Sequence, residues 1–506
     1  MGAPLGGASV TVIQGRNYIN GEWRDASETF ESVNPSDIRE TVGVFPASGK
    51  AEADEAIAAA SAAFPSWKRL SRINRGEIID NFAQLLKRDR DELIQLCARE
   101  VGKQWNESYA DVIEAIHMTQ FVAGYARQPN GFVVPSEIPA KDAYIIRKPK
   151  GVTVCIAPWN FPVAIPLWEV LPAVLEGNTC VLKPSPYSSA CGYKLAQLLD
   201  EAGFPKGVVN VIHGGGPDCG EVLTHHPDTR LILFTGSFAV GQSIQQFVAT
   251  DPIKFAACEL GGKNQLLVLD DANMDIAIPA AVMSAYKTSG QRCVSVGRIL
   301  VDRTREAEFT ERFLDASQRL RIGNAMDRDV FTGPLVNEQG REKFERHNAR
   351  AREEGFEVLL DGGRLTGGEH EHGYFVSPFV YRGEYRDDSW VLNEEAFSPH
   401  VAILPVDGLD EAIRIHNEVP YGLAAAVITE DYRKWRECRE ELEVGLLYVN
   451  LPSIGAEVHL PFGGMKRSGN GHPGAATLID YVTHRTAFTV NHDHEIKMAQ
   501  GLSAEL

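Results

Sequence analysis

The sequence predicts an α/β protein with two parallel-sheet domains and a small β arm. From about Gly151 onward, short apolar strands rich in Val, Ile and Leu alternate with helical segments. Such alternation requires crossover connections, which produce mostly parallel sheets. Ligands bind these sheets beyond the carboxyl ends of the strands, so residues that follow a strand are candidates for a site. The predicted strands are Thr153–Ala157, Thr179–Lys183, Val208–Ile212, Leu231–Thr235 and Lys254–Leu260.

A second alternating series follows a glycine pair, Gly261–Gly262, which we expect to mark a domain boundary. It contains a strand at Asn264–Asp270, a helix at Met274–Thr288, a strand at Arg298–Asp302 and a long helix after Thr304. The helices of the first series are predicted at Trp168–Gly177, Ser189–Gly203 and Gly241–Ala249.

Before the first series, the chain reads as one helix from Asp54 to about Leu86. Ile78, Phe82, Leu85 and Leu86 fall on one face at helical spacing, and Lys87 and Arg88 close the run.

Two β-prone segments, Asp142–Lys148 and Asp480–Val490, do not fit the alternation. We expect both to be arm strands that pair with something outside their own domain.

Composition excludes several classes of protein. At 506 residues the chain is too long for a single compact core, and its net charge of −18 argues against a nucleic-acid partner. The eight cysteines are scattered without paired spacing, which favours reduced thiols in a cytoplasmic protein. The N-terminus has no secretory pattern, and no apolar run of about 18 residues predicts a membrane span.

Three residues carry candidate chemistry. Cys293 lies between a predicted helix and a strand with Arg292 beside it, which suggests a nucleophilic thiol of lowered pKa; a buried small hydrophobe is the alternative. Glu259 ends a strand and precedes two glycines, so it could be a general base or a structural ion-pair partner. Asn160, held between two prolines, could stabilise an oxyanion or form a turn.

Further residues suggest a phosphate-bearing cofactor. Lys183 ends a strand, and Gly236 and Gly241 bracket a strand–turn–helix junction that can present backbone N–H groups to a pyrophosphate. Glu395 could meet ribose hydroxyls, and a glycine-rich loop spans Pro461–Gly471 without indicating what it contacts. The histidine-rich tracts have no paired second cluster, so no metal site is expected.

Taken in order, these segments resemble the aldehyde dehydrogenase superfamily across nearly the whole chain. The ordered set is PWNFP, LKPS, FTGS, ELGGKN, GQRC, EEAFSP and PFGGMKRSG. The resemblance implies NAD(P)-dependent oxidation of an aldehyde through a thioester on Cys293, with Glu259 as general base. It places Asn160 and the Cys293 backbone N–H in the oxyanion hole. The implied cofactor contacts are Trp159, Lys183, Ser185, Pro186, Gly236, Ser237, Gly241, Glu395 and Phe397.

The resemblance also implies two Rossmann-type α/β domains and an oligomerisation arm. The cofactor-binding domain would comprise residues 1–130 and 150–258, and the catalytic domain residues 259–476. The arm would comprise residues 131–149 and 477–506, and members of the family usually form homodimers or homotetramers through it.

The chain departs from the family at Pro186. Many NAD-preferring relatives carry a glutamate there, which binds ribose hydroxyls and repels a 2′-phosphate. We therefore expect both NAD and NADP to be accepted.

The substrate is predicted less directly. Lys287, six residues before Cys293, could pair with the carboxylate of a semialdehyde or extend to solvent, and Arg292 is a second candidate contact. The segment IGAEVHLPFGG is similar to members that oxidise carboxylated semialdehydes. Trp168, Tyr286 and Phe462 could instead line a site for an aromatic aldehyde. The sequence is also compatible with an aliphatic aldehyde, with transfer of the acyl group to CoA and with a non-catalytic structural role.

Overall fold

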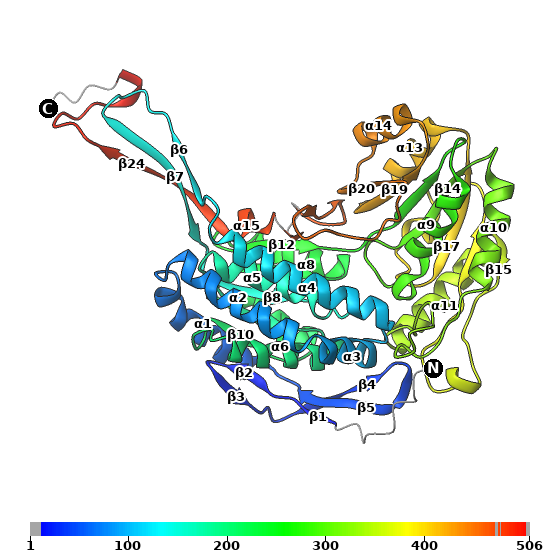
Figure 1. Ribbon diagram of the computed structural model, residues 1–506, viewed down its shortest axis with the longest axis horizontal. Coiled ribbons are helices and arrows are strands. Elements are labelled where there is room, and N and C mark those ends of the chain that lie inside the picture. Colours follow the sequence, from blue (N-terminus) through cyan, green and yellow to red (C-terminus); the bar gives the residue numbers. More distant parts are fainter. Residues whose placement is uncertain (1–11, 471–473, 476, 502–506) are drawn as a thin grey trace.

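The computed structural model describes residues 12–470, 474–475 and 477–501. The termini of the predicted domains, residues 1–11 and 502–506, and the end of the predicted glycine loop, Gly471, lie outside this part. Figure 1 shows two α/β bodies side by side and a β arm that projects from one of them.

The first body is built on a sheet with the strand order β12-β11-β8-β9-β10-β2-β3. The neighbours from β12 to β10 run parallel, and β2 and β3 extend the sheet antiparallel. All five strands predicted for this region are confirmed. The bounds are β2 Asn17–Ile19, β3 Glu22–Arg24, β8 Val152–Ile156, β9 Thr179–Lys183, β10 Val209–Val211, β11 Thr229–Thr235 and β12 Phe255–Glu259.

Helices cover both faces of this sheet, which explains why its strands are apolar at successive positions rather than alternately. Val181 of β9 packs into the core beneath the first helix, whereas Cys180 and Leu182 pack into the core on the other face. The helices are α1 Lys50–Trp67, α2 Arg72–Arg88, α3 Arg90–Val101, α4 Trp105–Tyr125, α5 Ala164–Leu175, α6 Ser189–Glu201, α7 Val222–His225 and α8 Phe238–Val248.

The prediction of one helix from Asp54 to Leu86 is wrong, because the chain turns between α1 and α2. The Ser71 hydroxyl accepts a hydrogen bond from the Asn74 N–H at 3.1 Å and so caps α2. Such a cap contributes about 1 kcal/mol, enough to fix a new helix start.

The second body has a sheet with the order β15-β16-β17-β14-β13-β19-β20, parallel except at β15. The chain leaves the first sheet after Glu259 and enters the second at Asn264, so Gly261–Gly262 lies in the connection. The strands are β13 Asn264–Val268, β14 Val296–Asp302, β15 Glu357–Leu360, β16 Phe379–Arg382, β17 His400–Val406, β19 Ala424–Ile428 and β20 Leu446–Val449. Its helices are α9 Met274–Tyr286, α10 Glu306–Gln318, α11 Glu338–Glu353, α12 Trp390–Asn393, α13 Leu409–Glu418 and α14 Tyr432–Glu441.

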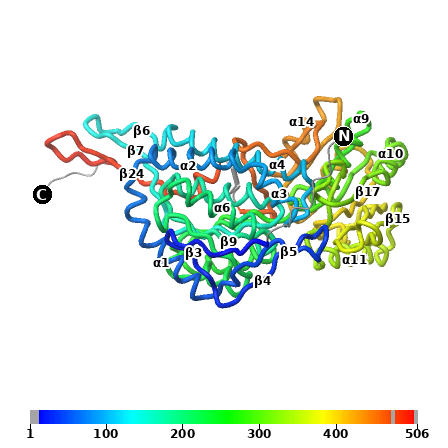
Figure 2. Tube along the Cα trace, turned by 60° about the horizontal axis from the view of Figure 1, so that its bottom comes forward, coloured from blue at the N-terminus to red at the C-terminus, as the bar shows by residue number. Residues whose placement is uncertain are grey.

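The arm is an antiparallel sheet with the order β24-β7-β6. The two β-prone segments predicted from sequence pair with each other from Thr483 opposite Pro149 to Asn491 opposite Lys141. Asp480, the predicted start of the second segment, lies instead in the short helix α15, Leu478–Tyr481. Figures 1 and 2 show this sheet extending away from the first body. The strands are β6 Gly131–Val134, β7 Lys141–Pro149 and β24 Thr483–Asn491.

Smaller elements complete the described chain. They are β1 Ile13–Gln14, β4 Thr29–Asn34, β5 Asp37–Pro46, β18 Tyr421–Gly422, β21 Pro461–Phe462, β22 Met465–Lys466, β23 Gly474–Ala475 and α15 Leu478–Tyr481. Among the described residues, no helix is both long and apolar enough to cross a bilayer. The same residues contain no group of three or more His, Cys, Asp or Glu side chains arranged to hold a metal ion.

Candidate active site

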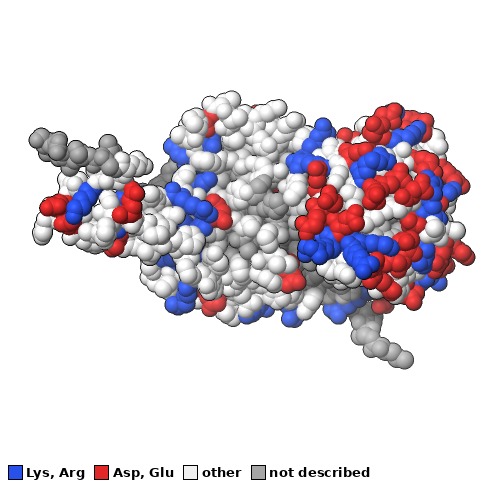
Figure 3. Space-filling model, turned by 90° about the horizontal axis from the view of Figure 1, so that it is seen from above, with Lys and Arg blue, Asp and Glu red and all other residues white. Residues whose placement is uncertain are grey.

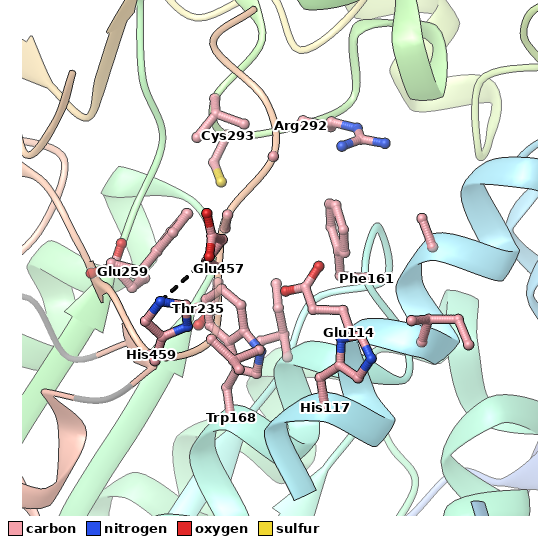
Figure 4. A pocket seen from close by; sticks show the side chains of 18 of the residues that line it. Glu114, His117, Phe161, Trp168, Thr235, Glu259, Arg292, Cys293, Glu457 and His459 are labelled. Atoms are coloured by element: carbon pink, nitrogen blue, oxygen red, sulfur yellow. Dashed lines mark ion pairs between the residues drawn. The ribbon is translucent and has the colours of Figure 1, made fainter. Parts of the chain in front are cut away.

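Cys293 lies where two cavities meet, one of about 640 Å³ and one of about 400 Å³. Four residues line both of them: Ile165, Thr235, Glu259 and Cys293. In Figure 4 the sulfur of Cys293 points into the larger cavity, with Glu259 to one side and Phe161 to the other. A reactant on either side can therefore reach this thiol.

The backbone before Cys293 is left-handed at Thr288, Ser289 and Gly290, with φ of 55°, 54° and 70°. Two non-glycine residues in this region cost free energy, so the surroundings must hold them in place. Glu107 accepts hydrogen bonds from the backbone N–H and the hydroxyl of Thr288, and the Ser289 hydroxyl donates to the Gly333 carbonyl. The helix predicted to run to Thr288 consequently ends at Tyr286.

Beyond the kink, the Asn264 side-chain amide donates to the carbonyl oxygens of Cys293 at 2.6 Å and Ser295 at 2.9 Å. Asn264 is the first residue of β13, so the second sheet fixes the cysteine loop directly.

The pKa of the Cys293 thiol is raised to about 12, first by burial and then by the nearby Glu259 and Glu395 carboxylates. The expectation that Arg292 would lower this pKa is wrong in its net effect. The Arg292 guanidinium pairs with Glu107 at 2.7 Å, and its opposing effect on the thiol is weaker than burial. The thiol therefore needs a base before it can act as a nucleophile.

Asn160 follows β8 and lines the smaller cavity beside Cys293. One amide hydrogen of its side chain is donated to the Gln291 carbonyl at 2.9 Å, which fixes the amide and leaves its second hydrogen for another acceptor. The backbone N–H of Cys293 donates to no described residue. These two donors form a candidate oxyanion hole.

Lys103 supports Asn160, and no sequence pattern pointed to it. Its ammonium donates to the Asn160 carbonyl at 2.9 Å and pairs with Asp111 at 3.0 Å, with both side chains fully buried. Asp111 in turn accepts the Ala164 N–H that opens α5. The only signal in the sequence is a lysine directly after the helix-ending Gly102, which does not indicate a buried role.

Glu259 ends β12, and neither of its buried carboxylate oxygens has a hydrogen-bond partner among the described residues. Burial, and next the Glu169 carboxylate, raise its pKa well above the usual range. A carboxylate without fixed partners and with a raised pKa is suited to accept a proton.

The glycine-rich loop packs against this strand. Leu260 donates its N–H to the Ser468 carbonyl at 2.8 Å, and Gly469 forms a β-bridge with Glu259. A Cβ on Gly469 would lie 2.7 Å from the Cys258 carbonyl oxygen, so only glycine allows this close approach. The loop therefore contacts the strand that carries the candidate base.

The smaller cavity is lined by groups that can bind parts of a dinucleotide. Gly236 and Ser237 line it at the start of α8, whose first N–H groups have no side-chain cap and can bind a phosphate. Glu395 accepts the Gly262 N–H at 2.9 Å on one oxygen, and its other oxygen is available to ribose hydroxyls. Trp159 and Phe397 meet edge to face at 5.7 Å. This cavity is also lined by three residues at the start of α11 that no sequence pattern indicated: Asn337, Gln339 and Lys343.

Four predicted cofactor residues do not line the smaller cavity. Lys183 is buried and donates to the carbonyls of Pro184 and Gly214. Ser185 caps the short turn Pro186–Ser188, and Pro186 lines a neighbouring cavity of about 380 Å³. Gly241 packs closely, because a Cβ there would lie 2.3 Å from the Leu260 side chain, and its predicted contact with the cofactor stays a prediction.

The larger cavity is mainly apolar with a few charged groups. Its aromatic residues are Tyr109, Phe161, Trp168, Tyr448 and Phe462, and Trp168 meets Phe462 edge to face at 5.1 Å. Apart from Cys293 and Glu259, the acidic and basic residues that line this cavity are Glu114, His117, Arg292, Glu457 and His459. Burial and Asp111 raise the pKa of Glu114 to about 8, so this carboxyl is mostly neutral at pH 7.

The structure corrects two predicted substrate residues, Lys287 and Tyr286. The Lys287 ammonium donates to the Phe331 carbonyl at 3.2 Å, and Lys287 does not line the cavity. Tyr286 is fully buried behind the cavity, where its ring stacks on Phe313.

Arg292 is the cation that reaches the cavity wall. Its Nε and Nη2 are bonded to Thr288 and Glu107, and its Nη1 has no partner among the described residues. Burial alone would raise the pKa of Glu107. The charges of Arg292 and Lys287, together with the hydrogen bonds from Thr288, lower it further than burial raises it, so this pKa lies below its usual range. Two cations around one carboxylate leave a local positive charge.

Comparison of the sequence with known proteins shows the family to which the chain belongs. The profile of the aldehyde dehydrogenase family matches residues 23–487. Alpha-ketoglutaric semialdehyde dehydrogenase of Bacillus subtilis is 33% identical over 89% of this chain and 93% of that protein. Human 2-aminomuconic semialdehyde dehydrogenase is 35% identical over 94% of this chain and 98% of that protein.

Among solved structures, betaine aldehyde dehydrogenase of Staphylococcus aureus in complex with NAD⁺ superposes with a TM-score of 0.92. It is 30% identical in sequence, and the match covers 97% of each chain. Proline utilization A of Bdellovibrio bacteriovorus superposes with a TM-score of 0.91 at 32% identity, over 96% of this chain and 50% of that chain.

Proposed function

The chain belongs to the aldehyde dehydrogenase family, and from this premise we propose that it oxidises a carboxylate-bearing semialdehyde to the corresponding acid with NAD or NADP. The proposed substrate class rests on one observation: the side chain of Arg292, the residue before Cys293, lines the larger cavity.

The reaction begins at the sulfur. Glu259 accepts the thiol proton of Cys293, and the thiolate attacks the carbonyl carbon of the aldehyde to form a carbon–sulfur bond. The negative charge that develops on oxygen is stabilised by the Asn160 side-chain amide and the Cys293 backbone N–H. Because Gln291 and Lys103 hold Asn160 in place, little reorganisation accompanies the step.

The smaller cavity holds the dinucleotide through Gly236, Ser237 and Glu395, beside Trp159 and Phe397. When bound, the nicotinamide supplies the hydride acceptor that turns the adduct into a thioester. Glu259 releases the thiol proton to solvent through the larger cavity and can then accept a second proton, this time from water. The water oxygen bonds to the thioester carbon, and the carbon–sulfur bond breaks to release the acid and the thiolate.

Two relatives support this substrate class, because one is an alpha-ketoglutaric semialdehyde dehydrogenase and the other a 2-aminomuconic semialdehyde dehydrogenase. Both semialdehydes pair an aldehyde with a distant carboxylate. Arg292 offers an unpaired N–H edge for such a carboxylate, and charge-assisted hydrogen bonds of this kind contribute about 1.5–3 kcal/mol.

Arg292→Ala tests this assignment. The KM for a carboxylated semialdehyde is expected to rise by about 10- to 100-fold, the equivalent of one charge-assisted hydrogen bond. The KM for a neutral aldehyde of the same length is expected to stay within about threefold, since no such bond is lost. Lys287→Ala is the matched control, because that ammonium belongs to the same charge cluster but does not line the cavity.

Removing Arg292 leaves the buried Glu107 unpaired, so Arg292→Lys is measured beside it. The lysine keeps the charge and loses the planar donor edge. Equal changes in KM for the charged and neutral aldehydes in both variants would reject the carboxylate assignment.

The aromatic residues of the larger cavity favour a neutral aromatic aldehyde as the second candidate. A panel of acidic, aromatic and aliphatic aldehydes, each tested with NAD⁺ and NADP⁺ and with or without CoA, separates these substrate classes. Formation of acid whether or not CoA is present supports hydrolysis by Glu259. An acyl-CoA product would overturn that role.

Cys293→Ala tests the reaction itself. We expect no cofactor reduction with any aldehyde of the panel and a nearly unchanged melting temperature, because Cys293 is only partly buried, at the edge of the core. Oxidation by this variant at the wild-type rate would exclude the thioester route.

We also propose that the chain works as a cytoplasmic homodimer or homotetramer through its arm. Phe132, Val133 and Phe488 of the arm expose 58%, 78% and 49% of their surfaces, an apolar area that a second copy would cover. Figure 3 shows charged side chains crowded over the second body, while the first body is sparsely charged on the same side. The eight cysteines are all free thiols, as a reducing compartment favours.

The proposed division into domains follows the sheets. Residues 1–130 and 150–258 bind the cofactor, residues 259–476 carry the catalytic cysteine, and residues 131–149 and 477–506 form the arm. The pairing of β7 with β24 and the passage between sheets after Glu259 support these boundaries.

A further inference from the structure

A third, small void lies next to Glu259. It is lined by Glu169, Thr235 and Glu259 together with apolar side chains, and its volume is about 10 Å³, close to what a single water molecule requires. Thr235 and Glu259 therefore line this void and both large cavities.

Glu169 is a buried carboxyl on α5 that forms no ion pair with any described residue. Only 5% of the residue is exposed, and one oxygen accepts the Thr235 hydroxyl at 2.8 Å. Its other oxygen is buried and has no hydrogen-bond partner in the described part of the chain. The same holds for both oxygens of Glu259.

The titratable groups whose charges affect the pKa values of this pair of carboxyls are acids, although His117, Arg292 and His459 line the larger cavity that Glu259 also lines. Burial is the main cause that raises the pKa of each carboxyl, and Glu169 adds its charge to the effect on Glu259. The groups that interact with the two carboxyls are Cys155 on β8, Cys258 on β12, Cys293 and Tyr481 on α15. Among the described residues, no lysine, arginine or histidine contributes to either shift.

Two buried carboxyls that lie together do not ionise at the same pH, since the charge of the first opposes the ionisation of the second. We propose that Glu169 and Glu259 hold one proton between them, so that Glu169 is a positioning residue that sets the pH at which Glu259 can act as the base. This inference rests on the proposed role of Glu259 in thioester hydrolysis.

The shared proton is conserved over the hydrolytic step. In the resting pair the negative charge lies on Glu169, which accepts the Thr235 hydroxyl, and the proton lies on Glu259. Glu259 releases this proton to solvent in the larger cavity and then accepts a proton from the attacking water, whose oxygen joins the thioester carbon as the Cys293 thiolate leaves. The pair then holds one proton again.

Glu169→Gln tests the inference, because glutamine keeps the shape of a neutral carboxyl and cannot ionise. In the variant, the acid limb of the hydrolytic rate is expected to move to lower pH by at least about one unit, as removal of a neighbouring like charge requires. The rate of acid formation after the burst of reduced cofactor, measured from pH 5 to 9, gives this limb. Glu169→Asp retains an ionisable carboxyl and should restore the wild-type limb.

Glu114→Gln is the matched control, since Glu114 is another carboxyl of raised pKa in the larger cavity and does not line the small void. Its acid limb should stay in place. Infrared difference spectra should also show one protonated carboxyl in the resting wild type that is absent from Glu169→Gln.

The outcomes separate the two proposals. If Glu169 had only a structural role, its substitution would lower the hydrolytic rate equally at all pH values and would also lower the melting temperature. An acid limb that does not move in Glu169→Gln would overturn the inference. Glu259→Gln addresses the base itself: if acid still forms from its thioester at the wild-type rate, the proposed role of Glu259 fails, whatever Glu169 does.

Discussion

Around Cys293, burial and two carboxylates outweigh one guanidinium. Arg292 is adjacent in the sequence, yet its charge is directed into an ion pair with Glu107, whereas Glu259 and Glu395 act on the sulfur from other strands and loops. The resting thiol is therefore neutral at pH 7 and unreactive toward chance electrophiles.

This predicts how alkylation of the protein without substrate depends on pH. A raised pKa means that the thiolate is scarce at neutral pH and increases as pH rises, so labelling by iodoacetamide should accelerate about tenfold per pH unit from 7 to 9 without reaching a plateau. Mass spectrometry of the labelled peptide measures the rate. The other seven cysteines are buried and serve as internal controls. A plateau below pH 8 would contradict the raised pKa.

Pro186 gives a second prediction at this scale. It lines the cavity next to the dinucleotide site, where Glu31 and Glu100 are the charged residues among the described lining. With no carboxylate at position 186, both cofactors should be used, with NAD⁺ favoured by less than about a thousandfold in kcat/KM, about 4 kcal/mol.

Pro186→Glu should lower kcat/KM for NADP⁺ by about 10- to 100-fold relative to NAD⁺, because a further negative charge would face the 2′-phosphate. Pro186→Gln is the neutral control for the loss of the proline ring. An equal fall for both cofactors in Pro186→Glu would show that only the backbone had changed.

The sequence drew attention to Cys293, Asn160 and Glu259 because each lies at or near the end of a regular element, and the resemblance to aldehyde dehydrogenases implied the roles that are proposed for them. The sequence could not decide whether Lys287 or Arg292 lines the substrate cavity, since both lie within six residues of Cys293. The left-handed turn between them sends one side chain behind the cavity and the other into its wall, and nothing in the intervening Thr288 and Ser289 indicates positive φ.

Among the elements, the turn from Thr288 to Gly290 has the greatest influence on the site. A Cβ at Gly290 would lie 2.4 Å from the Ser398 carbonyl oxygen, while the backbone there has a φ of +70°. Gly290→Ala thus combines an unfavourable backbone conformation with a steric clash.

We expect Gly290→Ala to reduce kcat by at least about tenfold, since a displacement of about 1 Å at a reacting atom has effects of that size or larger. The matched control is Gly355→Ala, which has a similar φ of +80° and open space around its Cβ. The control should lose about 1 kcal/mol of unfolding free energy with kcat unchanged. Urea unfolding and steady-state kinetics on both variants provide the comparison.

Regular elements were predicted well where both faces are buried, as in β8, β9 and β11, because their apolar runs are bounded by glycine, proline or polar turns. The break between α1 and α2 was missed because Lys68–Ser71 contains no glycine or proline. A serine cap and a few backbone hydrogen bonds decide it, and such local effects are too small to dominate a sequence pattern.

At the scale of the whole molecule, the predicted family and the α/β fold are confirmed, since the profile spans residues 23–487 and solved relatives superpose over almost the entire chain. The arm strands were recognisable because they do not fit the alternation. Their pairing partner was not recognisable, since β7 and β24 lie more than 300 positions apart in the sequence.

The proposed assembly predicts that a charge on the arm disrupts it. Val133→Asp should shift the particle mass toward the monomer, because an exposed apolar contact would be replaced by a charge that must lose its hydration on association. Light scattering after size exclusion measures the mass. Tyr432→Asp on α14 is the control, with 59% exposure on the other body. The same mass for both variants would place the interface elsewhere.

Access to the sulfur from two separate sides has a kinetic consequence. The cavities share only the residues at the sulfur and its base, so an aldehyde and a dinucleotide do not obstruct each other's approach or departure. Bisubstrate kinetics should accordingly fit a random order of addition, and the spent dinucleotide can diffuse away while the acyl group is still attached.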